Sequence, residues 1–462
     1  MTFLDKTDKK NTFLALLGVL LMTAGVPFRP VMFAAVIFCG FAVIFINNPK
    51  TVICLMFTWL SFSTIFKFAM GDTSIYTYLQ LIVILKFLIM KRKVDTRFFI
   101  YWFLLTAYVL IGGVGALRDS IKFAIIPLMI YVFARETDGR DINRVSYYYL
   151  LGVFGSTIVS FFRNYIPNMS TFVGLKYVNL TFTSSGWQRA DRLGALWGDP
   201  NYYSVHLILA IAILIVWYSQ ERIKLPLFIV GYSALAVFGG LTGSKSFLIM
   251  FAILTVLIVY TVFKNKKYVL GAFFLLLIFI AGMLLLAGYF DVFSTVLKRL
   301  STSENVSDVT TGRLNLWFEY FNIFFSRPVK ALFGNGINNG FTLSTPHNTI
   351  IDTLDLLGLV GTVIFYICLY LSVSSVWKTI DKKRRSFLPL IGILGTYMGL
   401  SMFFSIDFGF ELFLAFGFLV PLVHKEEPAA AENEVDGTEQ SISTENANKD
   451  INSINREINE EA

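Results

Sequence analysis

One histidine of the chain lies where a polar segment turns into a long apolar run. It is His347, in "STPHNTIIDTLDLLGLVG", residues 344–361. An imidazole with an ordinary pKa of roughly 6.5 is mostly neutral at neutral pH and can accept a proton, so His347 is a candidate general base. A structural role also fits the spacing: Thr345 can cap a helix, Pro346 can take its first position, and His347 and Asn348 then lie in its first turn.

Positive side chains gather in the polar segments that precede this histidine. They are Arg189, Arg192, Lys298, Arg299, Arg313, Arg327 and Lys330, with Lys245 in the short turn "LTGSKS". Arginine suits phosphate oxygens, and Arg192 and Arg313 each lie beside an expected helix start, where unpaired N–H groups favour an anion. The sequence therefore predicts an anionic, phosphate-bearing partner. The alternative is that each cation holds lipid headgroups or pairs with Asp191, Asp199 or Glu319.

Two further motifs accompany these cations. In "GDPN", residues 198–201, Asp199 can cap a helix, Pro200 fits its first turn, and Asn201 has side-chain donors facing the loop. The glycine-rich "FGNGINNG", residues 333–340, neither follows a strand nor opens a helix, so it does not fit a dinucleotide or P-loop fingerprint. We expect it to be a turn that lines a sugar site.

The elements that must position these residues are apolar runs. The chain is 55% hydrophobic and 15% charged, and each run is close to the roughly 20 residues that a bilayer crossing needs. Backbone in lipid must satisfy its own hydrogen bonds, so the runs are helices. We expect about fourteen spans, near 12–26, 31–46, 52–69, 75–90, 98–116, 120–134, 145–163, 203–219, 225–241, 246–263, 268–288, 349–375, 387–403 and 408–424. The predicted fold class is an all-α polytopic membrane bundle.

The charges of the connecting segments set the orientation. Lys and Arg crowd every second loop, as the positive-inside rule requires of cytoplasmic loops. These loops are the N-terminus, Lys50, 91–97, 134–140, 221–224, 264–267 and 378–386. Both termini are then cytoplasmic. Residues 1–424 form the transmembrane domain, and residues 425–462, rich in acids and without aromatics, are expected to be a disordered cytoplasmic tail.

Two segments on the outer side, about 164–202 and 289–348, are too long for simple turns. In the second, Leu314, Trp317, Phe318, Phe321 and Phe325 recur at helical spacing. An amphipathic helix lying on the membrane surface is the expected structure. His347 and the cations named above all fall on this outer side, whereas His206 lies inside an apolar span.

Several classes of function are excluded. No basic face on a folded module is present, so nucleic acid is not an expected partner. Cys39, Cys54 and Cys368 lie in apolar runs, so neither a disulfide nor a metal framework is indicated.

The outer motifs resemble those of the O-antigen polymerase and O-antigen ligase superfamily of bacterial polysaccharide assembly. The matching pieces are "RADRLGALWGDPNYYSVHL", "LTGSKSFLIMF", "TTGRLNLWFEYFNIFFSRPVKALFGNGINNG" and "TPHNTIIDTLDLLGLVG", which follow in the family's order over residues 189–361. The resemblance implies a glycosyltransferase of the GT-C type in the cytoplasmic membrane, with its active site on the outer face and with no cofactor, metal or nucleotide sugar. Its partners would be membrane lipids, a polyprenyl-diphosphate-linked donor and acceptor, and other assembly proteins such as a flippase or a chain-length regulator.

The resemblance also implies roles for individual residues. Arg192 and Arg313 would hold the donor diphosphate, with Arg189 and Lys245 beside them, and His347 would act as general base on the acceptor hydroxyl. Asp199, Asn201 and Asn348 would support the site. Lys245 departs from the family, in which many members have arginine after "Thr-Gly-Ser", and a lysine offers a point charge rather than a fork.

Three functions remain open. The first is a polymerase that joins lipid-linked repeat units into a surface polysaccharide such as O-antigen, capsule or exopolysaccharide. The second is a ligase that moves finished glycan to a lipid, wall or protein acceptor. The third is a flippase for lipid-linked sugars, but transporters place ionisable residues at mid-membrane, whereas here the cations lie in the outer loops.

Overall fold

The structure, a computed structural model, divides the chain into two units, Met1–His424 and Lys425–Ala462. It describes residues 6–65, 75–89, 95–112, 117–136, 139–169, 179–183, 186–190, 193–197, 199–219, 222–264, 313–339, 342–343, 346 and 348–377. All of these belong to the first unit. The predicted tail, residues 425–462, lies outside the described residues.

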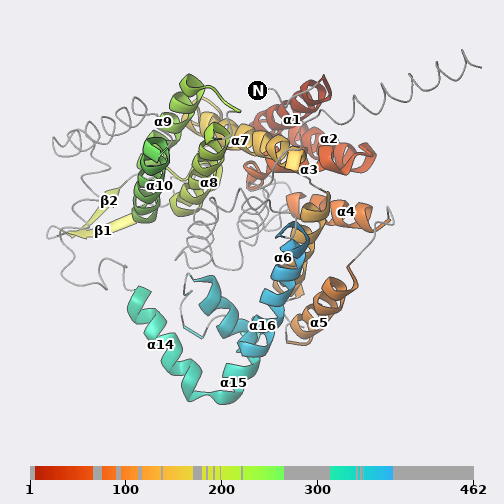
Figure 1. The fold of residues 1–462 in the computed structure, drawn as a ribbon, viewed down its shortest axis with the longest axis vertical. Helices are drawn as coiled ribbons and strands as arrows, with labels where there is room; N and C mark the ends of the chain where they lie inside the picture. The colour runs from red at the N-terminus through yellow and green to blue at the C-terminus, as the bar shows by residue number, and fades with distance from the viewer. Residues whose placement is uncertain are drawn as a thin grey trace, which may run out of the picture. The chain divides into compact units, whose positions relative to one another are not determined.

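Helices dominate the described residues (Figure 1). They are α1 Lys6–Gly25, α2 Arg29–Phe45, α3 Pro49–Leu60, α4 Ile75–Ile89, α5 Thr96–Gly112, α6 Leu117–Glu136, α7 Gly139–Phe161, α8 Pro200–Ser219, α9 Leu225–Leu241, α10 Lys245–Lys264, α14 Arg313–Ser326, α15 Pro328–Phe333 and α16 Thr349–Trp377. Eleven of the fourteen predicted ranges overlap helices, although α3 ends at Leu60, well before the predicted residue 69. The other three, 268–288, 387–403 and 408–424, fall outside the described residues.

Helix α3 forms the centre of the N-terminal part of the bundle. Every residue from Thr51 to Leu60 is buried, and α3 packs along α7 and against α1. A Cβ atom at Gly152 of α7 would lie 2.5 Å from the carbonyl oxygen of Thr58, so only glycine allows this approach. At the contact, the Thr58 hydroxyl donates to the carbonyl oxygen of Tyr148 at 2.9 Å.

Two further sets of helices carry the predicted site. Helix α8 packs against α9 and α10, while α16 packs against α5, α6 and α15 (Figure 1). Asp199 and Asn201 lie at the start of α8, Lys245 at the start of α10, Arg313 at the start of α14 and Asn348 just before α16, whereas Arg189 is in a strand.

The segment between α7 and α8 contains strands that an all-α prediction misses. Strand β1, Asn179–Thr183, pairs antiparallel with β2, Gly186–Ala190, and Leu180 lies opposite Arg189. A short 3-10 helix, η4, Ala195–Trp197, follows before α8. The first long loop thus includes a hairpin, and the helical fold class otherwise agrees with the described residues.

Helix α16 is not a straight span. Gly358 has φ 65° and ψ −176°, so the backbone leaves the helical conformation after Leu357 and resumes it at Leu359. Residues before the kink form a short first segment, and those after it form the longer one. The predicted single span 349–375 is therefore two helical segments joined at a glycine.

Two described helical stretches, Pro200–Tyr218 and Ile350–Ser372, are long and apolar enough to cross a membrane. Six shorter apolar helical stretches occur among the described residues, at Arg29–Phe45, Pro49–Leu60, Ile75–Ile89, Thr96–Gly112, Leu225–Leu241 and Phe247–Val256. By length and composition, these two helices are consistent with a chain that associates with a membrane.

Candidate functional site

Helix α14 is joined to the segment that precedes α16. The indole N–H of Trp317 donates to the carbonyl oxygen of Pro346 at 2.9 Å. One turn further along, the Tyr320 hydroxyl accepts a hydrogen bond from the N–H of Leu343 at 3.2 Å. Arg313 is the first residue of α14 and stands one turn before Trp317. The second turn of α14 and Pro346, just before the cap of α16, are therefore neighbours.

The start of α16 differs from the sequence prediction. Asn348, not Thr345, caps the helix: its Oδ1 accepts from the N–H groups of Ile350 at 3.0 Å and Ile351 at 3.3 Å. Its own carbonyl oxygen accepts from the N–H of Asp352 at 2.8 Å. Pro346 therefore precedes the cap, and the prediction that it takes the first helical position is wrong. Asn348 is buried and has a structural role in holding this helix start.

The glycine-rich segment packs into the kink of α16. Gly334 has φ 83° and ψ 175° and lies against Gly358, whose added Cβ would be 2.3 Å from the Gly334 nitrogen. Both conformations are essentially restricted to glycine. The N–H groups of Asn335 and Gly336 donate to the carbonyl oxygens of Asp355 and Leu356, which the kink exposes. This interlock fixes α15 on α16.

A tyrosine of α5 fixes the same interlock from the other side. The Tyr108 hydroxyl lies 2.9 Å from the carbonyl oxygen of Phe333 and 2.7 Å from that of Leu357. The expected turn at 333–340 is confirmed where it is described, with a short 3-10 helix, η5, at Ile337–Asn339. The turn is thus part of a rigid joint between α5, α15 and α16.

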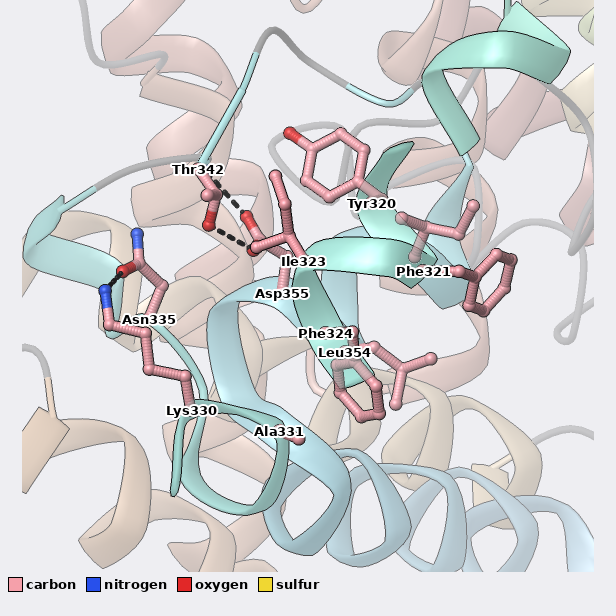
Figure 2. A pocket seen from close by; sticks show the side chains of 11 residues that line it. Tyr320, Phe321, Ile323, Phe324, Lys330, Ala331, Asn335, Thr342, Leu354 and Asp355 are labelled. Carbon is pink, nitrogen blue, oxygen red and sulfur yellow. Dashed lines mark hydrogen bonds between the residues drawn. The ribbon is translucent and has the colours of Figure 1, made fainter. Parts of the chain in front are cut away.

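A pocket of about 420 Å³, including space open to solvent, lies between α14, α15 and the start of α16 (Figure 2). Its polar side consists of Lys330, Asn335, Thr342 and Asp355, and its apolar side is mainly aromatic side chains of α14. The Lys330 ammonium donates to Asn335 Oδ1 at 2.7 Å. Thr342 donates to both oxygens of the Asp355 carboxylate, from its N–H at 2.9 Å and from its hydroxyl at 2.5 Å.

Tyr320 stands between the two sides of this pocket. It is buried to 4% exposure in an otherwise exposed stretch of α14. Burial raises the pKa of its hydroxyl above the usual range, against a smaller lowering by the Leu343 hydrogen bond. The hydroxyl therefore stays protonated while it accepts the hydrogen bond from Leu343.

A second set of predicted residues lies at the starts of α8 and α10. Asp199 caps α8, as predicted: its carboxylate accepts from the N–H of Asn201 at 2.6 Å. Pro200 is the first residue of α8, also as predicted. The hydroxyl of Ser204 lies 3.4 Å from that of Ser244, the residue before Lys245. The motifs "GDPN" and "LTGSKS" are therefore adjacent in the fold.

The segment 193–197 leads into this second set and is held at several points. The N–H of Leu193 donates to the carbonyl oxygen of Leu241 at 3.0 Å, and the Thr64 hydroxyl donates to the carbonyl oxygen of Leu196. Ala195 is fully buried with φ 45°, a conformation rare for residues other than glycine. Such strain persists only where the surroundings over-determine the backbone.

His206 of α8 packs against this segment. Its ring stacks on Trp197 with centroids 3.6 Å apart and an interplanar angle of 8°. Its Nδ1 lies 2.7 Å from the Tyr149 hydroxyl. The sequence showed only a histidine inside an apolar span, and its spacing from Trp197 gave no helical relation that would reveal the contact.

The predicted cations are described in part. Arg189 is in β2, Lys245 is the first residue of α10, and Arg313 is the first residue of α14, but the side chains of these three lie outside the described atoms. Arg192 and His347 lie outside the described residues altogether. Their roles stay predictions.

The predicted residues thus form two groups on different helices. One is at the starts of α8 and α10, which pack together with α9, and the other is at the starts of α14 and α16, which pack against α15. The contacts given above join the helices of each group, through Ser204 and Ser244 in the first and through Trp317 and Pro346 in the second. That the residues of both groups act together in one site remains a prediction.

Sequence reasoning missed the polar side of the α14–α16 pocket. Asp355 was read as part of an apolar helix, although "IDTLD" places two carboxylates in the first two turns of α16. That pattern of acids at an apolar helix start is the signal that could have identified it.

Among the residues that the structure describes, no cluster of three or more His, Cys, Asp or Glu side chains could hold a metal ion. In comparisons with known proteins, no protein-family model, curated protein or solved structure matches the chain.

Proposed function

We propose that the chain is an integral membrane glycosyltransferase that joins polyprenyl-diphosphate-linked repeat units into a surface polysaccharide at the outer face of the membrane. The observation that carries the proposal is the hydrogen bond between Trp317 and Pro346, which lie four residues after Arg313 and one residue before His347 in the sequence. Glycan transfer from a diphosphate carrier needs two groups: a cation that binds the leaving diphosphate and a base that accepts the proton of the acceptor hydroxyl.

Exposed apolar faces support a membrane location. On α2, Phe33, Ile37, Phe41 and Ile44 are spaced to form one stripe, and each is at least half exposed. Helices α5 and α9 carry similar exposed residues, such as Phe103, Ile111 and Val237. Monomeric proteins in water rarely expose contiguous apolar surface of this kind, whereas lipid chains would cover it. We propose about fourteen spans, with both termini cytoplasmic.

The proposed reaction is a displacement at the anomeric carbon of the donor glycan. The acceptor hydroxyl oxygen forms a bond to that carbon, while the bond from the carbon to the diphosphate oxygen breaks. The diphosphate leaves with the bonding electrons, and Arg313 and Arg192 stabilise its charge, with Arg189 and Lys245 beside them. The hydroxyl proton passes to His347, a contribution of about 10²–10⁴-fold for a positioned base.

The helix starts contribute to the same step. The helix dipoles at the starts of α10 and α14 add partial positive charge next to Lys245 and Arg313. Asp199 and Asn348 cap the neighbouring helices α8 and α16, so their role is to fix these starts in place. A ligase would use the same donor site and differ in its acceptor.

Substitution of the two central residues tests the proposal. Arg313→Ala and His347→Ala should each abolish polymer extension in cells while the protein remains in the membrane. Arg29→Ala is the matched control, because Arg29, like Arg313, is an arginine at the first position of a helix, here α2. It should leave the polymer unchanged. Polymer of normal length from the Arg313 and His347 variants would refute the proposal.

A further inference from the structure

Helix α14 has three chemically different sides. One side faces α16, where Tyr320, Ile323 and Phe324 line the pocket shared with that helix (Figure 2). The other two sides are exposed stripes that lie next to each other. The apolar stripe consists of Phe318, Phe321 and Phe325, and the polar stripe consists of Asn315, Glu319, Asn322 and Ser326. At 3.6 residues per turn, each set keeps to its own side of the helix.

The apolar stripe differs from the one that the sequence predicts. Trp317, which the spacing includes in it, is instead bonded to Pro346 of the same chain. The side chains that remain are strongly exposed, Phe318 to 59% and Phe325 to 76%. Helix α15 continues the pattern with three exposed side chains at the spacing of one helix face. The α14–α15 apolar face is therefore Phe318, Phe321, Phe325, Val329, Leu332 and Phe333.

We propose that the α14–α15 apolar face lies in the outer leaflet of the membrane, so that these two helices anchor the protein in the lipid interface without crossing it. Helix α14 has 14 residues, fewer than the roughly 20 that a crossing needs, and lipid chains could not cover its polar stripe. A helix that lies in the plane of the interface buries an apolar side and leaves a polar side in water. The proposal rests on the membrane location in the proposed function.

Contacts with α5 fix the level of α15 in the bundle. The Tyr108 hydroxyl donates to the carbonyl oxygen of Phe333, the last residue of α15, and Tyr108 is about one turn before Gly112, where α5 ends. Gly336 packs against that end, since a Cβ on it would lie 3.3 Å from the Gly112 carbonyl oxygen. The charges of the preceding loop, residues 91–97, predict that this end of α5 is the outer one. Helix α15 therefore ends at the level where α5 leaves the membrane.

Exposed apolar surface continues from this joint onto the neighbouring helices. Ile111 of α5 and Leu359 of α16 are both exposed, and the Tyr108 hydroxyl also bonds to the carbonyl oxygen of Leu357. Lipid that covers α5 and α16 at this level would reach α15 as well. Arg327, exposed between α14 and α15, adds a positive charge beside the apolar face, which suits anionic lipid headgroups.

The anchor would set the level of the proposed site in the membrane. From α14, Trp317 and Tyr320 bond to Pro346 and Leu343 in the segment before α16. An apolar face held in the lipid interface keeps this segment at the level of the headgroups. The diphosphate of a polyprenyl carrier lies at the same level, because it joins a lipid tail to a polar glycan.

Site-specific fluorescence of the full-length protein in lipid nanodiscs tests the proposal. Two pairs of neighbouring residues are replaced by cysteine and labelled with bimane: Phe318→Cys with Glu319→Cys, and Phe325→Cys with Ser326→Cys. The native cysteines are buried, so the label should react with the new thiol. We expect nitroxide-labelled lipids to quench most of the emission from the Phe318 and Phe325 positions. Aqueous iodide should quench the Glu319 and Ser326 positions instead.

Ile37→Cys on the exposed stripe of α2 is the reference for a lipid-facing position. If nitroxide lipids quench Ile37→Cys but quench both members of each pair equally, the anchor is refuted and the membrane location stands. Protection of the Phe318 and Phe325 positions from both quenchers would also overturn the proposal, because protein would then cover the face. Absence of quenching at Ile37→Cys would contradict the membrane location itself, and with it both this proposal and the proposed function.

Discussion

The indole nitrogen of Trp317 donates a 2.9 Å hydrogen bond to the carbonyl oxygen of Pro346, and this bond joins two segments 29 residues apart in the chain. It is the contact that places the start of α14 next to the approach to α16. In the motif "TPHN", Pro346 is followed directly by His347, the proposed base. The position of Pro346, the residue before the proposed base His347, is therefore fixed in part by an indole from another helix.

Removal of this indole N–H should reduce activity more than stability. Trp317→Phe keeps most of the apolar contact and loses one hydrogen bond, which is worth about 0.5–1.5 kcal/mol. We expect about tenfold slower transfer, because a small displacement of a catalytic group is costly. Trp102→Phe is the control, since it loses a similar 2.8 Å bond to Ala124 in another part of the bundle. Equal rates for the two variants would contradict the prediction.

The interlock of Gly334 and Gly358 should tolerate no side chain. Gly358→Ala places a Cβ 2.3 Å from the Gly334 nitrogen and forces alanine into a conformation that costs about 1–3 kcal/mol. The thermal unfolding midpoint in detergent should fall clearly. Gly40→Ala in α2 meets nothing within 4 Å and should be neutral or stabilising. A Gly358 variant as stable as the Gly40 variant would show that the interlock is unimportant.

The cap of α16 can be tested with a pair of substitutions. Asn348→Ala removes the acceptor for the N–H groups of Ile350 and Ile351 and should cost about 0.5–2 kcal/mol. Asn348→Asp keeps an acceptor and should retain stability near that of the wild type. Thermal unfolding measures both. If Asn348→Ala is as stable as the wild type, another group caps the helix.

The helix positions were largely predictable from the sequence. The predicted span 225–241 coincides with α9, because Pro226 marks its start and a Gly-Gly pair its end. Apolar runs bounded by proline, glycine or charge leave little choice in where a helix lies. The start of α8 at Pro200, with Asp199 as its cap, was predictable for the same local reason.

Other features could not be predicted because they depend on tertiary contacts. "TPHN" contains two residues that can cap, Thr345 and Asn348, and local sequence rules do not decide between them; in the structure Asn348 is the cap. The kink at Gly358 was hidden in an apolar run, since its cause is the approach of Gly334. The contact of His206 with Trp197 likewise spans a helix start.

Cysteine labelling tests the proposed orientation in the membrane. The native cysteines Cys39, Cys54 and Cys368 are buried, so background labelling should be low. Ser326→Cys at the end of α14 and Lys224→Cys before α9 both introduce exposed thiols. A membrane-impermeant maleimide should label Ser326→Cys in intact cells, and Lys224→Cys only after permeabilisation. If both variants were labelled in intact cells, the prediction that these two positions lie on opposite sides of the membrane would be contradicted.

The central claim is transfer of a glycan from a polyprenyl diphosphate carrier, and incubation of the purified protein with a lipid-linked repeat unit tests it most directly. We predict a ladder of lengthening lipid-linked chains on a gel, with wild-type protein and without added nucleotide sugar, and no ladder with His347→Ala. Transfer only to a different acceptor would indicate a ligase. Unchanged substrate, or substrate that merely crosses vesicle membranes, would contradict the claim.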